Sequence, residues 1–384
     1  MRAIPSKEIN LRALLTSSYA GSPRVFRAAN VLMELGMEVV VVEWDRTGKL
    51  PARDSRDGVQ VIRYRRKAPF GVLALPHLLL WMTWLLALML RENFDLVQAK
   101  NLDSLLPAII ARALKGFILI YDMADFYADS HIRIPLLRQL VAWIERSLVV
   151  RVDLLTLVSP KQVEQLSGIV PERFLILYNS PPLEEVQGEP GSELTMVYVG
   201  TLGRERCDSL LKLIELAVKT GYKFVIAGFG ECEDLMRKIS ESVKGVSFLG
   251  RVSRDEALRL VAKAHLVASY YDPRITFNHV IGLPNKFLDA LMVGRAVLVA
   301  EGTYLGELVE EYGVGVAVNL NEMDEAVKRV KELTKEELMR RGARGRELFL
   351  RKFTWEKASL KYKLMVSELL SRKGRGGSQR NGTS

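Results

Sequence analysis

Short apolar runs alternate with longer amphipathic segments along the whole chain, a pattern typical of β-strands that are each followed by an α-helix. In the first half, the apolar runs are residues 9–16, 39–42, 94–99, 117–121, 154–158 and 176–178. In the second half, they are residues 195–200, 224–227, 246–249, 266–271, 296–300 and 314–318. Because strands that alternate with helices pair in parallel, we expect an α/β protein with two Rossmann-like domains, each built on a parallel sheet.

Composition places the boundary between these two domains near the middle of the chain. Residues 183–194 are rich in Glu, Gly and Pro, which is typical of a linker. We therefore expect an N-terminal domain over residues 1–182 and a second domain over 195–350. The last twelve residues, 373–384, contain mostly Gly, Ser, Arg and Asn, and we expect them to be disordered.

Charge is unevenly distributed over these segments. Residues 1–182 carry a net charge of +6, residues 183–350 carry −3, and residues 351–384 carry +7. A basic first half and tail indicate an anionic surface or substrate. The first apolar segment is too short for a secretory signal, so we expect a cytoplasmic protein.

Cysteine and histidine are both scarce. Two cysteines, Cys207 and Cys232, exclude a disulfide framework and fit a reducing compartment. The four histidines lie at no spacing that suggests a zinc site, so we expect no metal.

The stretch from residue 270 to residue 300 carries the strongest local signals. Pro284 suits the first turn of a helix and Gly294 suits its C-terminal cap. The preceding loop is too long for a plain connection, which argues for a function. The helix N-terminus can hold an anion, and Asp289 lies within reach of a sugar hydroxyl beside it. An ordinary loop and helix of an α/β domain remains the alternative.

The motif P-N-K-x-x-D-A-L-x-x-G-x-A-V, which begins at Pro284, resembles a segment of the retaining nucleotide-sugar glycosyltransferases of family 4 (group 1). That resemblance implies the GT-B fold, in which two Rossmann-like domains face a cleft. It also implies that the helix over 351–372 crosses back to the N-terminal domain. Asp289 would contact the nucleotide ribose. The family has a second Glu where this chain has Ile281, and that departure bears on sugar recognition.

A second motif, Thr-Leu-Gly203-Arg204-Glu-Arg206, follows a predicted strand and resembles the family's phosphate loop, with Cys207 in place of a Gly. The resemblance implies that Arg206 and Lys286 stabilise the departing diphosphate as catalytic residues. It implies further donor-binding residues, namely Gly200, Gly203, Arg204, Gly228, Gly230, Arg251, His279, Gly282, Leu283, Pro284, Asn285 and Asp289.

Acceptor-side candidates follow strands of the first domain. Asp122 and Asp125 come after the strand over 117–121 and resemble the family's segment D-x-H-D/E, with Ala124 at the His position. Asp125 would act in catalysis. The remaining acceptor-side candidates are Asn101, Gly21 and Arg24. Turn formation and helix capping are equally good explanations for each of these residues.

Residues 63–67 read Arg-Tyr-Arg-Arg-Lys and lead into an almost wholly apolar run over 70–90 that includes Trp81 and Trp84. Its helical part spans roughly 21 Å, short of a hydrocarbon core of about 30 Å. The run is therefore either a buried helix or one that lies in a membrane interface, and the neighbouring cations favour the interface.

Together these observations predict a hexosyl-transferring enzyme. We expect it to move a sugar from a UDP or GDP sugar to a glycan or lipid-linked acceptor, with retention. We expect it to act without a cofactor, at a membrane surface and without nucleic acid. A sugar-nucleotide epimerase on the same fold, or a non-catalytic sugar-nucleotide-binding protein, are the alternatives.

Overall fold

The structure is a computed structural model that describes residues 11–69, 74–132 and 134–380. The chain divides into two compact units. Unit 1 comprises residues 1–177 and 359–384, and unit 2 comprises residues 178–358. The predicted linker, residues 183–194, contains no helix or strand.

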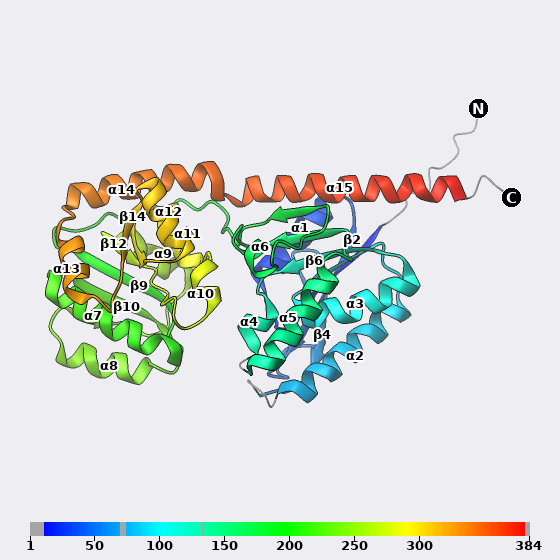
Figure 1. Ribbon diagram of the computed structural model, residues 1–384, viewed down its shortest axis with the longest axis horizontal. Helices are drawn as coiled ribbons and strands as arrows, with labels where there is room; N and C mark the ends of the chain where they lie inside the picture. The colour runs from blue at the N-terminus through cyan, green and yellow to red at the C-terminus, as the bar shows by residue number, and fades with distance from the viewer. Residues whose placement is uncertain (1–10, 70–73, 133, 381–384) are drawn as a thin grey trace. The chain divides into compact units, whose positions relative to one another are not determined.

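Unit 1 is built on an eight-stranded sheet in the order β3-β4-β2-β1-β5-β6-β7-β8 (Figure 1). All neighbours pair in parallel except the β3–β4 hairpin. Its strands are β1 (Arg12–Ser17), β2 (Glu38–Asp45), β3 (Arg53–Arg56), β4 (Val59–Arg65), β5 (Leu96–Lys100), β6 (Ile118–Met123), β7 (Leu154–Leu157) and β8 (Phe174–Ile176). Its helices are α1 (Pro23–Glu34), α2 (Leu75–Arg91), α3 (Leu102–Lys115), α4 (Tyr127–His131), α5 (Pro135–Val149) and α6 (Gln162–Gln165).

Unit 2 is built on a six-stranded, wholly parallel sheet in the order β11-β10-β9-β12-β13-β14. Its strands are β9 (Thr195–Thr201), β10 (Lys223–Phe229), β11 (Val246–Phe248), β12 (Leu266–Ala268), β13 (Ala296–Ala300) and β14 (Gly315–Val318). Its helices are the 3₁₀ turn η2 (Arg204–Arg206), α7 (Cys207–Thr220), α8 (Glu233–Ser242), α9 (Arg254–Ala262), α10 (Phe277–Ile281), α11 (Asn285–Val293), α12 (Tyr304–Tyr312), α13 (Met323–Lys331), α14 (Lys335–Leu348) and the π-helical turn η3 (Phe349–Phe353). The expected α/β fold with two parallel-sheet domains is therefore confirmed.

The last helix, α15 (Trp355–Arg380), runs from unit 2 into unit 1. Tyr362 of this helix is fully buried in unit 1, where its hydroxyl donates to Gln98 Oε1 at 2.5 Å. Lys363 forms an ion pair with Glu34 at 3.0 Å. Because α15 continues to Arg380, the tail expected to be disordered from residue 373 is helical to that point, and residues 381–384 lie outside the described residues.

The apolar run over 70–90 forms α2, apart from residues 70–73, which are not described. Trp81 is fully buried and stacks between Trp44 and Trp84, with ring centroids 6.0 Å and 5.9 Å apart. Trp81 therefore belongs to the core of unit 1, because helical spacing turns Trp81, Leu85 and Met89 towards the sheet, and Trp84 is partly buried against that core. No helix in the described part of the chain is both long and apolar enough to cross a bilayer.

The two cysteines form a disulfide, contrary to what their small number suggested. Cys207 begins α7 and Cys232 immediately precedes α8. The two positions meet because β9 and β10 are parallel neighbours, so the loops after them leave the same edge of the sheet. Sequence spacing alone did not reveal this pairing.

Candidate active site

The connections after β9 and β12 leave the sheet of unit 2 in opposite directions. From β9 the strand order runs through β10 to β11 on one side, and through β12 to β14 on the other. In open parallel sheets, ligands bind outside the carboxyl ends of the strands at such a reversal. The two predicted cations, Arg206 and Lys286, come from the segments that follow these two strands.

The loop that carries Arg206 is firmly attached to its neighbour. Leu202 donates its N–H to Phe229 O at 2.9 Å, and Cys232 donates to Leu202 O at 3.0 Å. The backbone N–H of Arg204 donates to Glu231 Oε2 at 2.9 Å. Together with the disulfide, these bonds fix the position from which Arg206 extends.

Two of the predicted glycines, Gly228 and Gly230, permit this close approach of backbone segments, and a third, Gly200, leaves room for the Lys286 side chain. A Cβ at Gly228 would lie 1.9 Å from Gly200 O, and a Cβ at Gly200 would lie 3.0 Å from Lys286 Nζ. Both residues have φ close to +158°, which side chains disfavour. Gly230 is similar, because its Cβ would meet Leu202 O at 2.6 Å.

Lys286 lies in the first turn of α11, whose N-cap is Pro284 and whose C-terminus is capped by Gly294 in the left-handed conformation. Its Nζ is buried and has no hydrogen-bond partner among the described residues. The nearest groups are aromatic, with Nζ 3.7 Å from the Tyr198 ring centroid and 5.1 Å from that of Tyr271. Burial, and then repulsion from Arg206, lowers the pKa of Lys286 well below its usual value.

Arg206 also lies against Tyr271. Its guanidinium carbon is 4.6 Å from the Tyr271 ring centroid. Burial opposes the charge of Arg206, but Tyr271 and Tyr198 raise its pKa. Burial raises the pKa of Tyr198 to about 12, so its hydroxyl keeps its proton and donates to Thr201 O at 2.8 Å. Arg206 also forms an ion pair with Glu205, at 3.4 Å. Arg206 lies close enough to Lys286 to repel its charge, and two such cations suit an anion.

Sequence analysis did not identify Tyr198 or Tyr271. Tyr198 lies within the buried strand β9, and Tyr271 follows β12. Each was part of an apolar run, where an aromatic residue usually means core. The sequence offered one signal, namely that both residues lie towards the carboxyl end of a predicted strand.

His279 and Asp289 already have protein partners. His279 Nδ1 lies 2.9 Å from Asp272 O, and its ring packs edge-on against Tyr271. Burial lowers the pKa of His279, which keeps the imidazole neutral. The Asp289 carboxylate accepts two hydrogen bonds from Arg254, at 2.6 Å and 2.7 Å.

The remaining predicted donor-binding residues differ in how far they are buried. Gly282 and Leu283 lead into α11, and Asn285 Oδ1 accepts from Asn179 at 3.0 Å. Arg251 is exposed and stacks over Phe229 at 4.5 Å. All of them lie within unit 2.

In unit 1, the structure turns two acceptor-side candidates towards each other. Arg24 and Asp122 are both buried and form a bidentate ion pair, with the shortest contact at 2.6 Å. Asp122 also accepts from Thr156 at 2.7 Å, and Arg24 donates to Leu177 O at 2.6 Å. These two residues therefore support the fold beneath the sheet edge and are not presented to an acceptor.

The other acceptor-side candidates lie at the ends of strands. Asn101 has φ of +59° and accepts from the N–H groups of Ala124 and Asp125. The side chain of Asp125 is exposed. Gly21 has φ of +76° and donates its N–H to Glu43 at 2.7 Å.

A polar group at the same edge of unit 1 escaped the sequence analysis. Lys100 Nζ donates to Ser22 Oγ at 2.9 Å and to the Tyr19 hydroxyl. Burial raises the pKa of the neighbouring Asp103. A lysine at the end of an otherwise apolar strand was the signal that could have identified this group.

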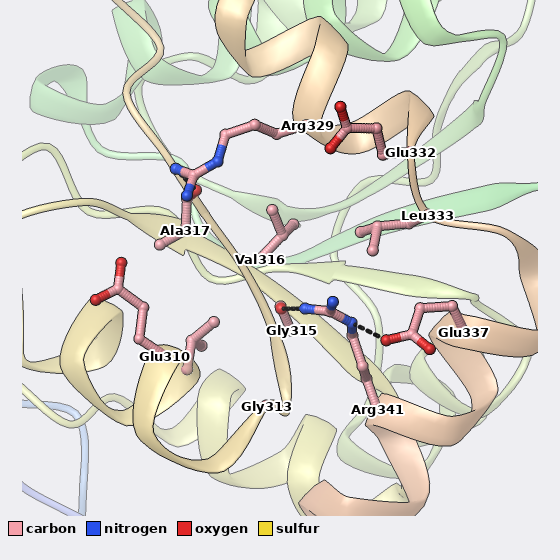
Figure 2. Close-up of a pocket in the computed structure, with 11 residues that line it drawn as sticks. Glu310, Gly313, Gly315, Val316, Ala317, Arg329, Glu332, Leu333, Glu337 and Arg341 are labelled. Carbon is pink, nitrogen blue, oxygen red and sulfur yellow. Dashed lines mark hydrogen bonds and ion pairs between the residues drawn. The ribbon is translucent and has the colours of Figure 1, made fainter.

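Unit 2 also has a pocket of about 590 Å³ beside its edge strand β14, lined by none of the predicted site residues. Figure 2 shows Arg341 bound both to Gly315 O, at 2.5 Å, and to Glu337. Arg329 similarly donates to Ala317 O and to Glu301. These arginines satisfy the free carbonyls of the sheet edge, so we assign no ligand to the pocket.

No group of three or more potential metal-ligating His, Cys, Asp or Glu residues occurs within the described ranges.

Solved structures show the same fold. Sucrose-phosphate synthase from Thermosynechococcus elongatus is 14% identical, with a TM-score of 0.75, over 94% of this chain and 100% of that one. HepE from Anabaena, in complex with UDP and glucose, is 15% identical, with a TM-score of 0.65 and the same coverage. The α,α-trehalose 6-phosphate synthase from Burkholderia multivorans is 10% identical, with a TM-score of 0.64, over 95% and 100% of the two chains.

Sequence comparison adds the family. No curated protein matches the sequence. Residues 21–180 match the glycosyl transferase 4-like domain, and residues 193–336 match the glycosyl transferases group 1 domain. With both domains in order on this fold, the chain belongs to the group 1 glycosyltransferases of the GT-B fold.

Proposed function

We propose that this glycosyltransferase moves a hexosyl group from a UDP or GDP sugar to a lipid-linked or glycan acceptor, with retention of the anomeric configuration. Unit 2 binds the nucleotide-diphosphate sugar, and unit 1 provides the acceptor side. Neither a metal nor another cofactor is required in this proposal, since protein cations neutralise the diphosphate.

The buried ammonium of Lys286 is the observation that supports this proposal most directly. A charged group without a partner is costly to bury, and an anion beside it would remove that cost. Arg206 supplies a second cation, and the N-terminus of α11 supplies free N–H groups. A diphosphate fits all three features. The UDP complex of HepE, which has the same fold, agrees with this choice of donor.

Catalysis in this proposal is mainly electrostatic. As the bond from sugar to diphosphate breaks, negative charge develops on the leaving oxygen, and Arg206, Lys286 and the α11 N-terminus stabilise it. Asp125, exposed after β6, would contact the acceptor hydroxyl. Asp289 would contact the ribose while it is held by Arg254.

Release of nucleoside diphosphate tests the proposal. The protein is incubated with a panel of UDP and GDP sugars, with and without a total lipid extract as acceptor. We expect release with one sugar, loss of release in Lys286→Ala, and an α-linked product by NMR if that donor is α-linked. If no donor gives release above the Lys286→Ala background, transferase activity is refuted. An inverted product would refute retention alone.

We also place the enzyme at the cytoplasmic face of a membrane. The exposed basic residues that support this location are Arg65, Arg66 and Lys67. Arg63 does not belong to this set, because its side chain lies inside unit 1 in ion pairs with Glu43 and Asp54.

A further inference from the structure

The first half of α5 exposes apolar side chains where a surface helix of a globular protein is usually polar. Leu136, Leu140 and Trp143 lie four and three residues apart, so they form one stripe, and they are 78%, 52% and 66% exposed. Ile134 and Leu137 beside them are also exposed. The helix meets the core only through later residues such as Ala142 and Val149.

The start of α2 repeats this arrangement. Leu75, Leu79 and Leu80 are exposed, whereas Trp81 and Leu85 of the same helix are buried. The two helices begin at the same edge of unit 1, because each follows the carboxyl end of a parallel strand, β4 for α2 and β6 for α5 by way of α4 (Figure 1). We call these eight exposed apolar residues the α2/α5 surface.

The charged residues within the two segments that form the α2/α5 surface are all positive. No Asp or Glu occurs between Arg65 and Arg91, nor from residue 134 to residue 144. Arg138 is exposed among the leucines of α5. Arg66 donates to His77 Nδ1 at 3.2 Å, which holds a cation beside the first turn of α2. Apolar side chains that are interspersed with cations along both segments match a layer with acyl chains beneath anionic head groups.

We propose that the α2/α5 surface docks on an anionic lipid bilayer, with the leucines and Trp143 among the acyl chains near the head groups. The proposal rests on the proposed function, because Asn101 and Asp125 lie at this same edge of the sheet, where a lipid-borne acceptor would arrive. It adds α5, a helix that the sequence did not single out, and it identifies which residues of α2 face the lipid.

Vesicle flotation tests the docking surface. The test variant is Leu136→Ser/Leu140→Ser/Trp143→Ser. The matched control is Ile110→Ser/Leu114→Ser, which changes similarly exposed apolar residues in the C-terminal half of α3, outside the α2/α5 surface. We expect the wild type and the control to float with phosphatidylglycerol vesicles, and to float less with phosphatidylcholine or in 1 M NaCl. The α5 variant should partition at least tenfold less.

Three results would overturn the proposal. The wild type could remain at the bottom of the gradient with anionic vesicles, or the α5 variant could float as well as the wild type. Sedimentation velocity could also show a wild-type dimer that the α5 variant dissociates while flotation is unchanged, which would assign the surface to a second copy of the chain.

A further measurement on each protein separates this proposal from the proposed function. An unchanged cooperative melting transition of unit 1 in the α5 variant shows that its fold survives and that any loss of flotation concerns the surface. A wild type that floats but releases no nucleoside diphosphate from any sugar would refute the transferase proposal and support the docking surface.

Discussion

The ammonium of Lys286 lies 3.7 Å from the centre of the Tyr198 ring, and no oxygen within the described residues accepts a hydrogen bond from it. A ring face attracts a cation but replaces only part of the water that the ammonium loses on burial. The free protein therefore retains an electrostatic cost at the position where we place the diphosphate.

The first prediction is that Lys286→Met stabilises the free protein at neutral pH by about 1–3 kcal/mol. Because the folded-state pKa of Lys286 lies below 10.5, the unfolded chain binds more protons between these two values. Wild-type stability should thus rise with pH through this window, and the advantage of the variant should shrink. Urea unfolding at a series of pH values measures the difference in unfolding free energy between the variant and the wild type. A difference that stays constant with pH would contradict the prediction.

The second prediction concerns the same cations in binding. Arg206→Ala and Lys286→Ala should each weaken binding of a nucleoside diphosphate by about 1.5–3 kcal/mol, because each removes a charge-assisted contact. Calorimetric titration measures the affinity. Arg237→Ala is the control, since that exposed arginine lies on α8 beside Phe248. Wild-type affinity in both test variants would remove the donor-site assignment.

The third prediction is that Asp289→Asn weakens nucleotide binding and reduces the preference for ribose over deoxyribose analogues, with the fold intact. Since Asp289 also binds Arg254, the control is Arg254→Met, which removes that partner but keeps the carboxylate. The two variants should differ in sugar preference when titrated with UDP and deoxy-UDP. Equal preference in both would make Asp289 a structural residue.

The fourth prediction is that Asp122→Ala destabilises unit 1 by about 3–5 kcal/mol, because it leaves the Arg24 guanidinium buried and unpaired. The double variant Arg24→Met/Asp122→Leu should lose much less. Burial opposes ionisation of Asp122, but Arg24 and Thr156 hold its pKa below 3.8. The stabilisation is therefore complete above that pH and is lost as the pH falls through the lowered pKa. Denaturant unfolding at pH 7 and pH 3 measures both effects.

The fifth prediction is that reduction of Cys207–Cys232 destabilises unit 2 by about 3 kcal/mol, from the closure entropy of a loop with a sequence separation of 25. Cys207→Ser/Cys232→Ser should unfold at a lower temperature than the oxidised wild type and be insensitive to reductant. Equal melting temperatures with and without dithiothreitol in the wild type would contradict the prediction.

Much of the architecture could be read from local patterns. The apolar runs marked most of the strands, and Pro284 and Gly294 marked the ends of α11 within one residue. The hairpin β3–β4 was missed, because its first strand is wholly exposed and polar and gave no apolar signal. Contiguous motifs singled out Arg206 and Lys286, which the structure brings near each other, and their role in donor binding stays a prediction.

The sequence by itself thus determined the order of strands and helices, the family and the positions of Arg206 and Lys286, since each depends on residues that are close together along the chain. Tertiary structure decided which distant residues meet. It paired Arg24 with Asp122 across 98 residues, joined the two cysteines, placed Tyr198 and Tyr271 against Lys286, and turned Trp81 inwards while leaving Trp143 exposed. Whether an apolar or charged side chain serves the core or the surface depends on its neighbours in space, and strand order, not local pattern, sets those neighbours.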